Sequence, residues 1–428
     1  MNKRRLLLLI LSGLLIFNLV GCSTKPIDKD EVIQGQVNEG QVSEENILDK
    51  DFEAMLEAAR GTTVTFYGWG GSQQTNSWID GYLSENVKKD YDITVKRVGM
   101  NIDEILNSLL NEKQLNVEKG NIDVVWINGE NFFTAKENNL LFGPFTDKLP
   151  NFNQYVDKDS PDVKYDFGYP VEGYEAPYGK AQMVMVYDSE KIDKTPVDHK
   201  ELLEWAKKNP GKFTYPALPD FTGSAFVRNI ICDIVGYEQF MDMEADEDTV
   251  RKAIEPAIEY LKELKPYLWK EGKTYPGDAP LLDNMYADGE VWMTMTYNPN
   301  SASGKVATGE YKESTRTFIF DRGTIGNTHF LAIPFNAQNK EGAMALINYI
   351  LNVESQATKY EPATWGDLPV LDNDKLSQEE KNRLDSIELG DATLPQDILL
   401  EHRIPEMPAD LVPIIEKIWM EEIPGEGE

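Results

Sequence analysis

The residues best suited to contact a ligand lie where a predicted strand ends. The segment Thr62–Tyr67 alternates β-branched and aromatic residues, which is typical of a strand, and it runs into Gly68-Trp69-Gly70-Gly71. Glycines allow a tight turn and a close backbone approach to another molecule. Trp69 adds a flat apolar face with one N–H donor. This loop is predicted to form one wall of a ligand site, or else a turn whose indole packs into the core.

A second polar loop follows another predicted strand. The stretch Asn121–Asn128 is nearly continuous in apolar residues, as expected for a strand covered on both faces, and Gly129, Glu130 and Asn131 come directly after it. Parallel strands end at the same edge of a sheet, so we expect this loop to lie beside Trp69. Glu130 could there pair with a positive group of a ligand.

A third candidate is a predicted helix start at Phe221-Thr222-Gly223-Ser224. Thr222 and Ser224 are good N-cap residues, and the sequence from Ala225 onward is apolar at helical spacing. Free N–H groups at a helix start bind anionic or hydroxyl groups. The alternative is an ordinary capped helix without a ligand.

Motifs for catalysis are missing from the sequence. It contains no CxxC, GxSxG, P-loop or HExxH pattern, and His199, His329 and His402 lie in different segments. His329 falls in a predicted strand and is expected to be structural. The chain also lacks a Tyr-Tyr pair, which disfavours an iron site. We therefore expect a binding protein without a cofactor or metal rather than an enzyme.

The elements that must position these loops alternate between strands and helices. Helical stripes at 76–89 and 102–118 separate three strands, which predicts a parallel α/β lobe. The segment from Ala176 to Asp188 is predicted as a strand that crosses to a second lobe. Thr328–Pro334 is predicted as a return strand.

The N-terminal segment has the features of a secretory signal. Three basic residues precede the apolar run Leu6–Val20, which is too short for a comfortable membrane span. Leu19-Val20-Gly21-Cys22 resembles the bacterial lipobox, which implies a signal peptide over 1–21 and a lipid (palmitate) on Cys22. A membrane anchor with a chance cysteine is the alternative. Residues 22–50 are polar and acidic and are predicted to be a flexible tether.

Composition excludes one class of partner. The chain has 42 Lys and Arg against 73 Asp and Glu, for a net charge of −31. Nucleic-acid binding needs a basic surface, so no nucleic-acid partner is expected. The acidity is compatible with a cationic ligand, although surface acidity usually serves solubility. Cys232 lies in an apolar run and is predicted to be a buried thiol.

Together, the lipobox, the Trp-Gly-Gly loop, the Tyr-bearing crossing strand and the late return strand resemble a bacterial solute-binding protein of family 1, an extracellular receptor of an ABC importer. The motifs at 68–71, 221–224 and Thr364-Trp365-Gly366-Asp367 are similar to its YnjB-type branch. The resemblance implies an α/β, two-lobed type II periplasmic-binding-protein fold, cluster D-like, with a multi-segment hinge. Lobe 1 would hold 61–178 and 328–355, and lobe 2 would hold 179–327 and 356–428.

The resemblance also implies a cleft between the lobes, lined by loops at equivalent positions. Four aromatic residues among them could stack on a flat or cationic ligand, and the others would offer polar or backbone groups. The implied ligand-binding residues are Trp69, Gly70, Gly71, Asn128, Gly129, Glu130, Tyr178, Thr222, Gly223, Ser224, Tyr297, Asn298 and Trp365.

Several functions remain open at this point. The first is a monomeric, lipid-anchored receptor on the outer face of the cell membrane, which hands a small solute to an ABC-importer permease. Aromatic residues, acidity and a helix start suited to phosphate favour a thiamine-like or another small cationic or polar compound. The alternatives are a secreted carbohydrate-active hydrolase, a sugar-binding receptor, and a surface receptor for a partner protein.

Overall fold

The structure, a computed structural model, describes residues 47–424. The predicted signal peptide, Cys22 and most of the predicted tether lie outside these residues. The strands are β1 Thr63–Gly68, β2 Thr94–Gly99, β3 Val124–Ile127, β4 Leu141–Phe142, β5 Tyr165–Asp166, β6 Tyr169–Pro170, β7 Glu175–Gln182, β8 Val184–Asp188, β9 Met293–Thr296, β10 Thr315–Phe318, β11 Thr324–Pro334 and β12 Arg403–Pro405.

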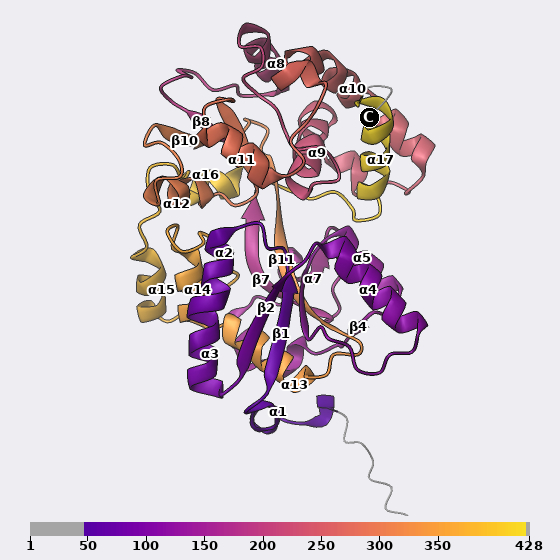
Figure 1. The fold of residues 1–428 in the computed structure, drawn as a ribbon, viewed down its shortest axis with the longest axis vertical. Coiled ribbons are helices and arrows are strands. Elements are labelled where there is room, and N and C mark those ends of the chain that lie inside the picture. The colour runs from indigo at the N-terminus through magenta and orange to yellow at the C-terminus, as the bar shows by residue number, and fades with distance from the viewer. Residues whose placement is uncertain (1–46, 425–428) are drawn as a thin grey trace, which may run out of the picture. The chain divides into compact units, whose positions relative to one another are not determined.

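The helices cover both faces of these strands and build most of the upper part of Figure 1. They are α1 Phe52–Ala59, α2 Gln73–Trp78, α3 Ser84–Tyr91, α4 Ile102–Gln114, α5 Glu130–Glu137, α6 Pro150–Tyr155, α7 Pro161–Lys164, α8 His199–Lys208, α9 Phe221–Val235, α10 Glu247–Leu264, α11 Ala279–Ala287, α12 Ser301–Ala307, α13 Lys340–Ile350, α14 Val353–Tyr360, α15 Gln378–Asp385, α16 Gln396–Glu401 and α17 Val412–Glu422.

The larger sheet has the order β12-β11-β3-β1-β2, with β4 and β7 also paired to β11. Strand β1 pairs in parallel with both β2 and β3, which confirms the predicted alternation of strands and helices. Residues of β1 alternate between exposed or half-buried and buried positions, whereas three of the four residues of β3 are buried. The apolar run of β3 therefore reflects its central place in the sheet.

A smaller sheet, β10-β8-β9, is antiparallel and lies in the upper part of Figure 1. The predicted crossing strand is divided at Met183: β7 belongs to the larger sheet, and β8 begins the smaller one. Strand β11 is longer than predicted and all of its eleven residues are buried. Figure 1 shows β7 and β11 passing between the two groups of elements.

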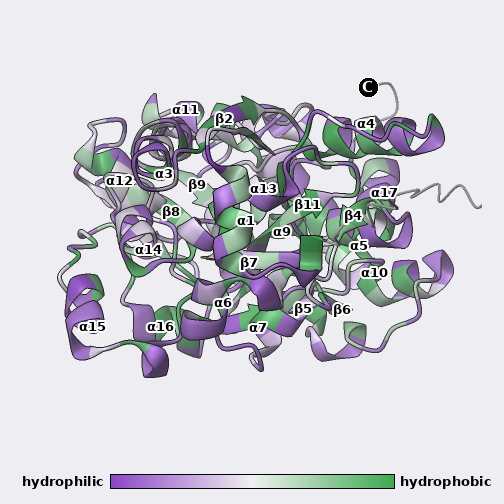
Figure 2. Ribbon diagram, turned by 90° about the horizontal axis from the view of Figure 1, so that it is seen from below, coloured by the Kyte–Doolittle hydropathy of each residue, from purple (hydrophilic) through white to green (hydrophobic). Residues whose placement is uncertain are grey.

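The hydrophobic core has two large parts, which we call the first and second lobes. The first lobe contains Val64, Phe66 and Ile347, and the second contains Phe226, Met293 and Trp419. The second core also buries the thiol of Cys232, as predicted. At the periphery, α15 is hydrophilic and buries none of its residues (Figure 2).

Two sequence-based boundaries need correction. Trp365 and Val370, predicted in the second lobe, pack in the core of the first. At the other end, residues 47–49 form a 3-10 turn, and Ile47 and Leu48 pack against the same core, so they do not belong to a tether. No helix among residues 47–424 combines the length and the apolar character needed to cross a bilayer.

Candidate functional site

The first wall of the candidate site forms where β1 ends. A Cβ built on Gly68 would lie 3.1 Å from the Cβ of Trp126 on the neighbouring β3. The indole of Trp69 lies over Gly71, whose added Cβ would be 2.3 Å from the ring atom Cζ2. Trp69 is 44 % exposed. It is therefore an aromatic surface open to solvent, and the alternative of a core side chain is wrong.

The loop after β3 lies at the same edge of the sheet, as predicted. Asn128 follows Ile127, the last residue of β3, and is half-buried. Because β1 and β3 are adjacent and parallel, Asn128 and Gly70 come from neighbouring strand ends. The Asn76 side chain donates a hydrogen bond of 2.8 Å to the carbonyl of Gly70 and holds this turn.

Gly129 turns the chain sharply into α5. Its φ of +62° is one that favours glycine, and an added Cβ would lie 2.9 Å from the ring of Phe167. The Gly129 N–H donates a hydrogen bond of 2.5 Å to Oδ2 of Asp166. The turn makes Glu130 the first residue of α5, where the helix dipole favours a negative charge.

The helix start on the second lobe differs from the prediction. Helix α9 begins at Phe221, and its cap is Asp220 rather than Thr222 or Ser224. Oδ1 of Asp220 accepts hydrogen bonds of 3.0 Å from the amides of both Thr222 and Gly223. The amide of Ser224 donates to the Asp220 carbonyl at 2.8 Å. These amides are therefore already paired, and an aspartate occupies the place predicted for an anionic ligand.

A buried ion pair lies one turn further along α9. Arg228 donates hydrogen bonds to Glu406 from Nε at 3.0 Å and Nη2 at 3.1 Å, and it also donates to the Ser224 hydroxyl. The Tyr297 hydroxyl donates to the same carboxylate of Glu406. Burial disfavours the charge on Arg228, but Glu406 compensates and raises the pKa of the guanidinium. Ser224 and Tyr297 are thus brought together, because each hydrogen-bonds to one member of this ion pair. Both hydroxyl groups are occupied by protein groups rather than by a ligand.

The two lobes meet beside this pair. The guanidinium carbon of Arg228 lies 5.7 Å from the centre of the Phe167 ring, and the Ala409 amide donates to the Phe167 carbonyl at 2.8 Å. We call this contact the seam: Glu130 and Phe167 of the first lobe against Arg228, Glu406 and Ala409 of the second.

Glu130 is the polar group of the seam that lacks a full set of partners. Its Oε1 accepts a hydrogen bond of 2.9 Å from Asn131, but its buried Oε2 has no partner among the described residues. Burial raises the pKa of Glu130 to about 7. Arg228 acts in the opposite direction, and the charges of Glu416 and Glu406 raise the pKa further. A carboxyl group of one lobe therefore responds to the charges of the other.

The remaining aromatic candidates pack on each other. The Tyr178 ring lies 5.4 Å from Trp126, 5.0 Å from His329 and 5.5 Å from Trp365, measured between ring centres. Tyr178 is fully buried, and Trp365 is nearly so. The sequence predicts both as stacking platforms for a ligand, whereas here both rings lie in the protein interior.

An ionic cluster sits next to these rings, at the crossing strands. Oδ2 of Asp367 lies 3.0 Å from Nε2 of His329 and also accepts a hydrogen bond from the ammonium of Lys359. Burial disfavours the charge on Asp367, but His329 and Lys359 outweigh it and lower the pKa of the carboxyl group. His329 thus has the structural place predicted for it.

Asn298 contacts the same loop from the second lobe. Its Nδ2 donates to the Trp365 carbonyl at 3.1 Å, and Nδ2 of Asn300 donates to the Gly366 carbonyl at 2.7 Å. These two bonds connect the end of β9 to the chain after α14. Asn298 therefore joins the two lobes rather than standing free for a ligand.

Sequence reasoning missed Arg228, Glu406, Asp166 and Glu416. One signal for Arg228 was present, because it is the only cation in the apolar run Ala225–Val235 and such a charge needs a buried partner. Glu406, between two prolines at 405 and 408, carries no such signal.

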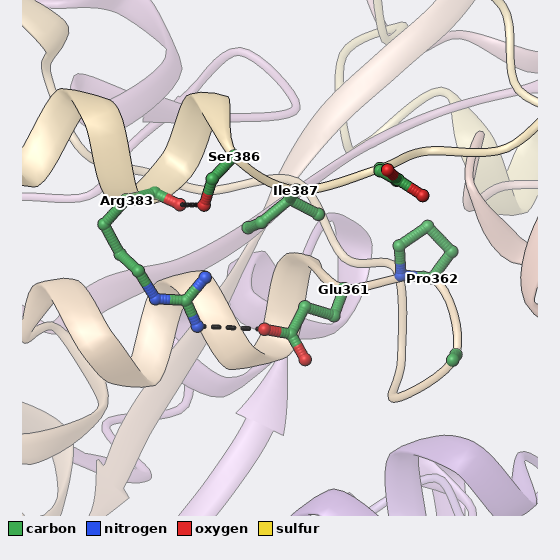
Figure 3. Close-up of a pocket in the computed structure, with 7 residues that line it drawn as sticks. Glu361, Pro362, Arg383, Ser386 and Ile387 are labelled. Carbon is green, nitrogen blue, oxygen red and sulfur yellow. Dashed lines mark hydrogen bonds and ion pairs between the residues drawn. The ribbon is translucent and has the colours of Figure 1, made fainter.

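Two surface hollows are lined by other residues. The one in Figure 3 has a volume of about 250 Å³, and there Arg383 forms a salt bridge of 2.9 Å with Glu361. The other, of about 520 Å³, is lined by Lys136, Tyr169 and Tyr174 among others. Neither includes a predicted site residue. Within residues 47–424, no group of three or more His, Cys, Asp or Glu side chains is arranged to hold a metal ion.

Sequence comparison relates this chain to a protein family and to a bacterial relative. The family model described as bacterial extracellular solute-binding protein matches residues 83–382. The chain is also 35% identical over 372 residues to the protein YnjB of Escherichia coli K12, an alignment that covers 86% of this chain and 93% of that protein.

Solved structures share the fold at low sequence identity. An ABC transporter from Clostridium perfringens is similar with a TM-score of 0.58 at 20% identity, over 84% of this chain and 98% of that one. The periplasmic binding protein AfuA of Actinobacillus pleuropneumoniae has a TM-score of 0.59 at 15% identity, over 85% and 98%. The substrate-binding protein PotD of Streptococcus pneumoniae has a TM-score of 0.58 at 15% identity, over 84% and 98%.

Proposed function

This chain belongs to the bacterial extracellular solute-binding proteins, and we propose that it holds one small solute at the seam between its lobes. Members of the family bind small solutes outside the cytoplasm and deliver them to the permease of an ABC transporter. The fold is the two-lobed type II periplasmic-binding-protein fold. What remains to be proposed is the position of the solute, its chemistry and the way the protein is attached.

The observation that carries the position is the buried Oε2 of Glu130, which has no hydrogen-bond partner among residues 47–424. A buried polar atom without a hydrogen bond costs free energy unless something pairs with it. Glu130 is close enough to Arg228 and Glu406 of the second lobe for their charges to act on it, so a solute that pairs with its carboxylate would lie between the two lobes. Such a solute favours the closed arrangement of the lobes, because it binds that state better than the open one.

The charges at the seam favour a cationic solute. Glu406 and Glu416 act on the carboxyl group of Glu130, and Glu130 and Glu406 act on Asp166, whereas Arg228 is the one cation among the described residues that acts on Glu130. The exposed indole of Trp69 supports a flat or cationic group, since a cation over an aromatic face gains about 0.5–2 kcal/mol. We propose a thiamine-like compound or another small cationic or polar molecule. PotD, which shares only the fold, is named for spermidine and putrescine.

The hinge is proposed to consist of the passage from β7 to β8 at Met183, strand β11, and the chain after α14. Each of these connects the first lobe to the second. The hydrogen bonds from Asn298 and Asn300 to the loop at Trp365 also cross from the second lobe to the first, next to the chain after α14. With Trp365 and Val370 assigned to the first lobe, the remaining sequence-based boundaries stand as a proposal.

The proposal for how the protein is attached to the membrane rests on the sequence alone. We propose that the segment 1–21 is removed, that Cys22 carries a lipid, and that the monomeric receptor stays on the outer face of the cell membrane near its permease. Incorporation of labelled palmitate into the protein, and its loss in Cys22→Ser with release into the medium, test this proposal. Labelling that persists in the variant would contradict it.

The solute itself is tested by native mass spectrometry of the purified protein, followed by thermal shift with thiamine, spermidine and a neutral oligosaccharide. We expect a cation to raise the melting temperature and Glu130→Gln to abolish that rise. Stabilisation by the oligosaccharide alone would point to the sugar-binding alternative. An assay with aryl glycosides tests the hydrolase alternative, and we expect no product from it.

A further inference from the structure

We propose that closing the seam requires positive charge at Glu130, supplied by a proton when the seam is empty and by the cationic group of the solute when it is filled. Proton and solute then compete for one carboxylate. The part that concerns the solute rests on the proposed function, whereas the part that concerns the proton does not.

The geometry leaves one oxygen for this purpose. Oε1 of Glu130 is used by Asn131 at 2.9 Å, and Oε2 is buried with no partner in the described part of the chain. A proton on Oε2, or an ammonium group beside it, removes the cost of an uncompensated buried charge.

The charged groups that act on Glu130 come from several elements. Helix α9 contributes Arg228, the segment after β12 contributes Glu406, and α17 contributes Glu416. Glu130 in turn raises the pKa of Asp166 on β5 of the first lobe. Asp103 of α4 in turn acts on Glu416.

Arg228, the one cation in this set, is already paired with a carboxylate. Arg228 makes its two-point ion pair with Glu406, so these two charges largely cancel. Glu416, which also hydrogen-bonds to Ser224, then leaves the environment of Glu130 negative. Closure therefore brings a carboxyl group of the first lobe against excess negative charge of the second.

The direction of the coupling follows from proton linkage. Burial raises the pKa of Glu130 from its ordinary 4.5 to about 7 in this arrangement, whereas in separated lobes the carboxyl would be hydrated. The closed state then binds a proton that the open state does not bind between these pH values. The ratio of closed to open protein is expected to rise up to about tenfold per pH unit as the pH falls below 7.

The test measures the distance between the lobes of the solute-free protein. Spin labels at Lys119→Cys and Asp248→Cys, both exposed positions, report this distance by electron–electron resonance in a Cys22→Ser background. Cys232 is buried and stays unlabelled. We expect the short-distance population to grow from pH 8 to pH 5, and Glu130→Gln to show the short distance at every pH.

Two further variants make the result specific. Glu175→Gln removes another buried carboxyl group, whose pKa responds to Asp166 and Lys136 but to no group of the second lobe, so its pH response should equal that of the wild type. Glu416→Gln removes a facing negative charge, so it should move the midpoint to lower pH.

A wild-type distance that does not change with pH, or a Glu130→Gln protein that responds like the wild type, would overturn the proposal. Absence of any stabilising solute in the thermal-shift panel would instead count against the proposed function. The two failures are distinguishable because the distance measurement uses no solute.

Discussion

Arg228 and Glu406 form a two-point ion pair in which the side chains are only 1% and 2% exposed. The two distances are 3.0 Å from Nε to Oε2 and 3.1 Å from Nη2 to Oε1. The partners are 178 positions apart in the chain, so the pair connects α9 to the segment after β12. Such a deeply buried pair holds the two segments in place but adds little net stability. The free energy lost when both charges leave water offsets much of the free energy gained from their attraction.

Breaking this pair on one side should destabilise the protein strongly. Glu406→Gln keeps the shape of the side chain but leaves the Arg228 charge buried without a counter-ion, and we expect a loss of about 3–5 kcal/mol in the free energy of unfolding. Guanidinium denaturation measures this loss. The control is Glu421→Gln, which removes a part-exposed partner of Arg251 and should cost less than about 1 kcal/mol. Equal losses in both variants would contradict the prediction.

Trp69 should affect solute binding and not stability. Because its indole is 44 % exposed, Trp69→Ala removes little core packing, but it removes the aromatic surface that we propose as a platform for the solute. We expect the Kd of a cationic solute to rise roughly 2- to 30-fold, the equivalent of about 0.5–2 kcal/mol. Isothermal titration measures this change, with Leu115→Ala, an exposed apolar side chain elsewhere, as the control. An unchanged Kd in Trp69→Ala would remove this residue from the site.

Gly179 should tolerate no side chain. A Cβ there would lie 1.9 Å from Oδ2 of Asp367 and 2.2 Å from Nε2 of His329, in the buried ionic cluster of the crossing strands. We expect Gly179→Ala to cost at least about 1–3 kcal/mol of unfolding free energy, since such overpacking forces neighbours apart. Gly277→Ala, where nothing lies within 4 Å of the added Cβ, is the matched control. Thermal melts that coincide for both variants would show that this cluster accommodates a methyl group.

Glu175 should make the stability depend on pH. It is fully buried with neither oxygen paired among residues 47–424, and burial, with Asp166, raises its pKa. A carboxyl whose pKa is raised by folding destabilises the protein as the pH rises above its unfolded value. We therefore expect Glu175→Gln to match the wild type near pH 4 and to exceed it at pH 8 by roughly 1–3 kcal/mol, since an uncharged amide avoids the desolvation cost of a buried carboxylate. Urea unfolding across this pH range measures the free energy of unfolding of both proteins. A difference between them that stays constant with pH would contradict the prediction.

Much of the fold follows from local patterns. The alternation in β1 and the apolar run of β3 identify two strands, and glycines after them mark their ends. Since parallel strands end at one edge, the location of Trp69 and Asn128 after neighbouring strand ends also follows. The N-cap of α9 did not follow, because Asp220, Thr222 and Ser224 are all competent caps and only the path of the preceding loop selects Asp220.

The sequence by itself determined which residues could line a site: an aromatic and glycines at one strand end, a carboxylate at the next. Whether each side chain is free or paired depended on tertiary structure. Tyr178 and Trp365 pack on each other, and Ser224 and Tyr297 are drawn to Arg228 and Glu406. The Ser224–Arg228 contact is local, one turn apart on α9, but Glu406 lies 109 positions from Tyr297, and Trp365 is similarly distant from Tyr178. No local pattern encodes these distant partners, because burial and pairing of charges are properties of the whole packed chain.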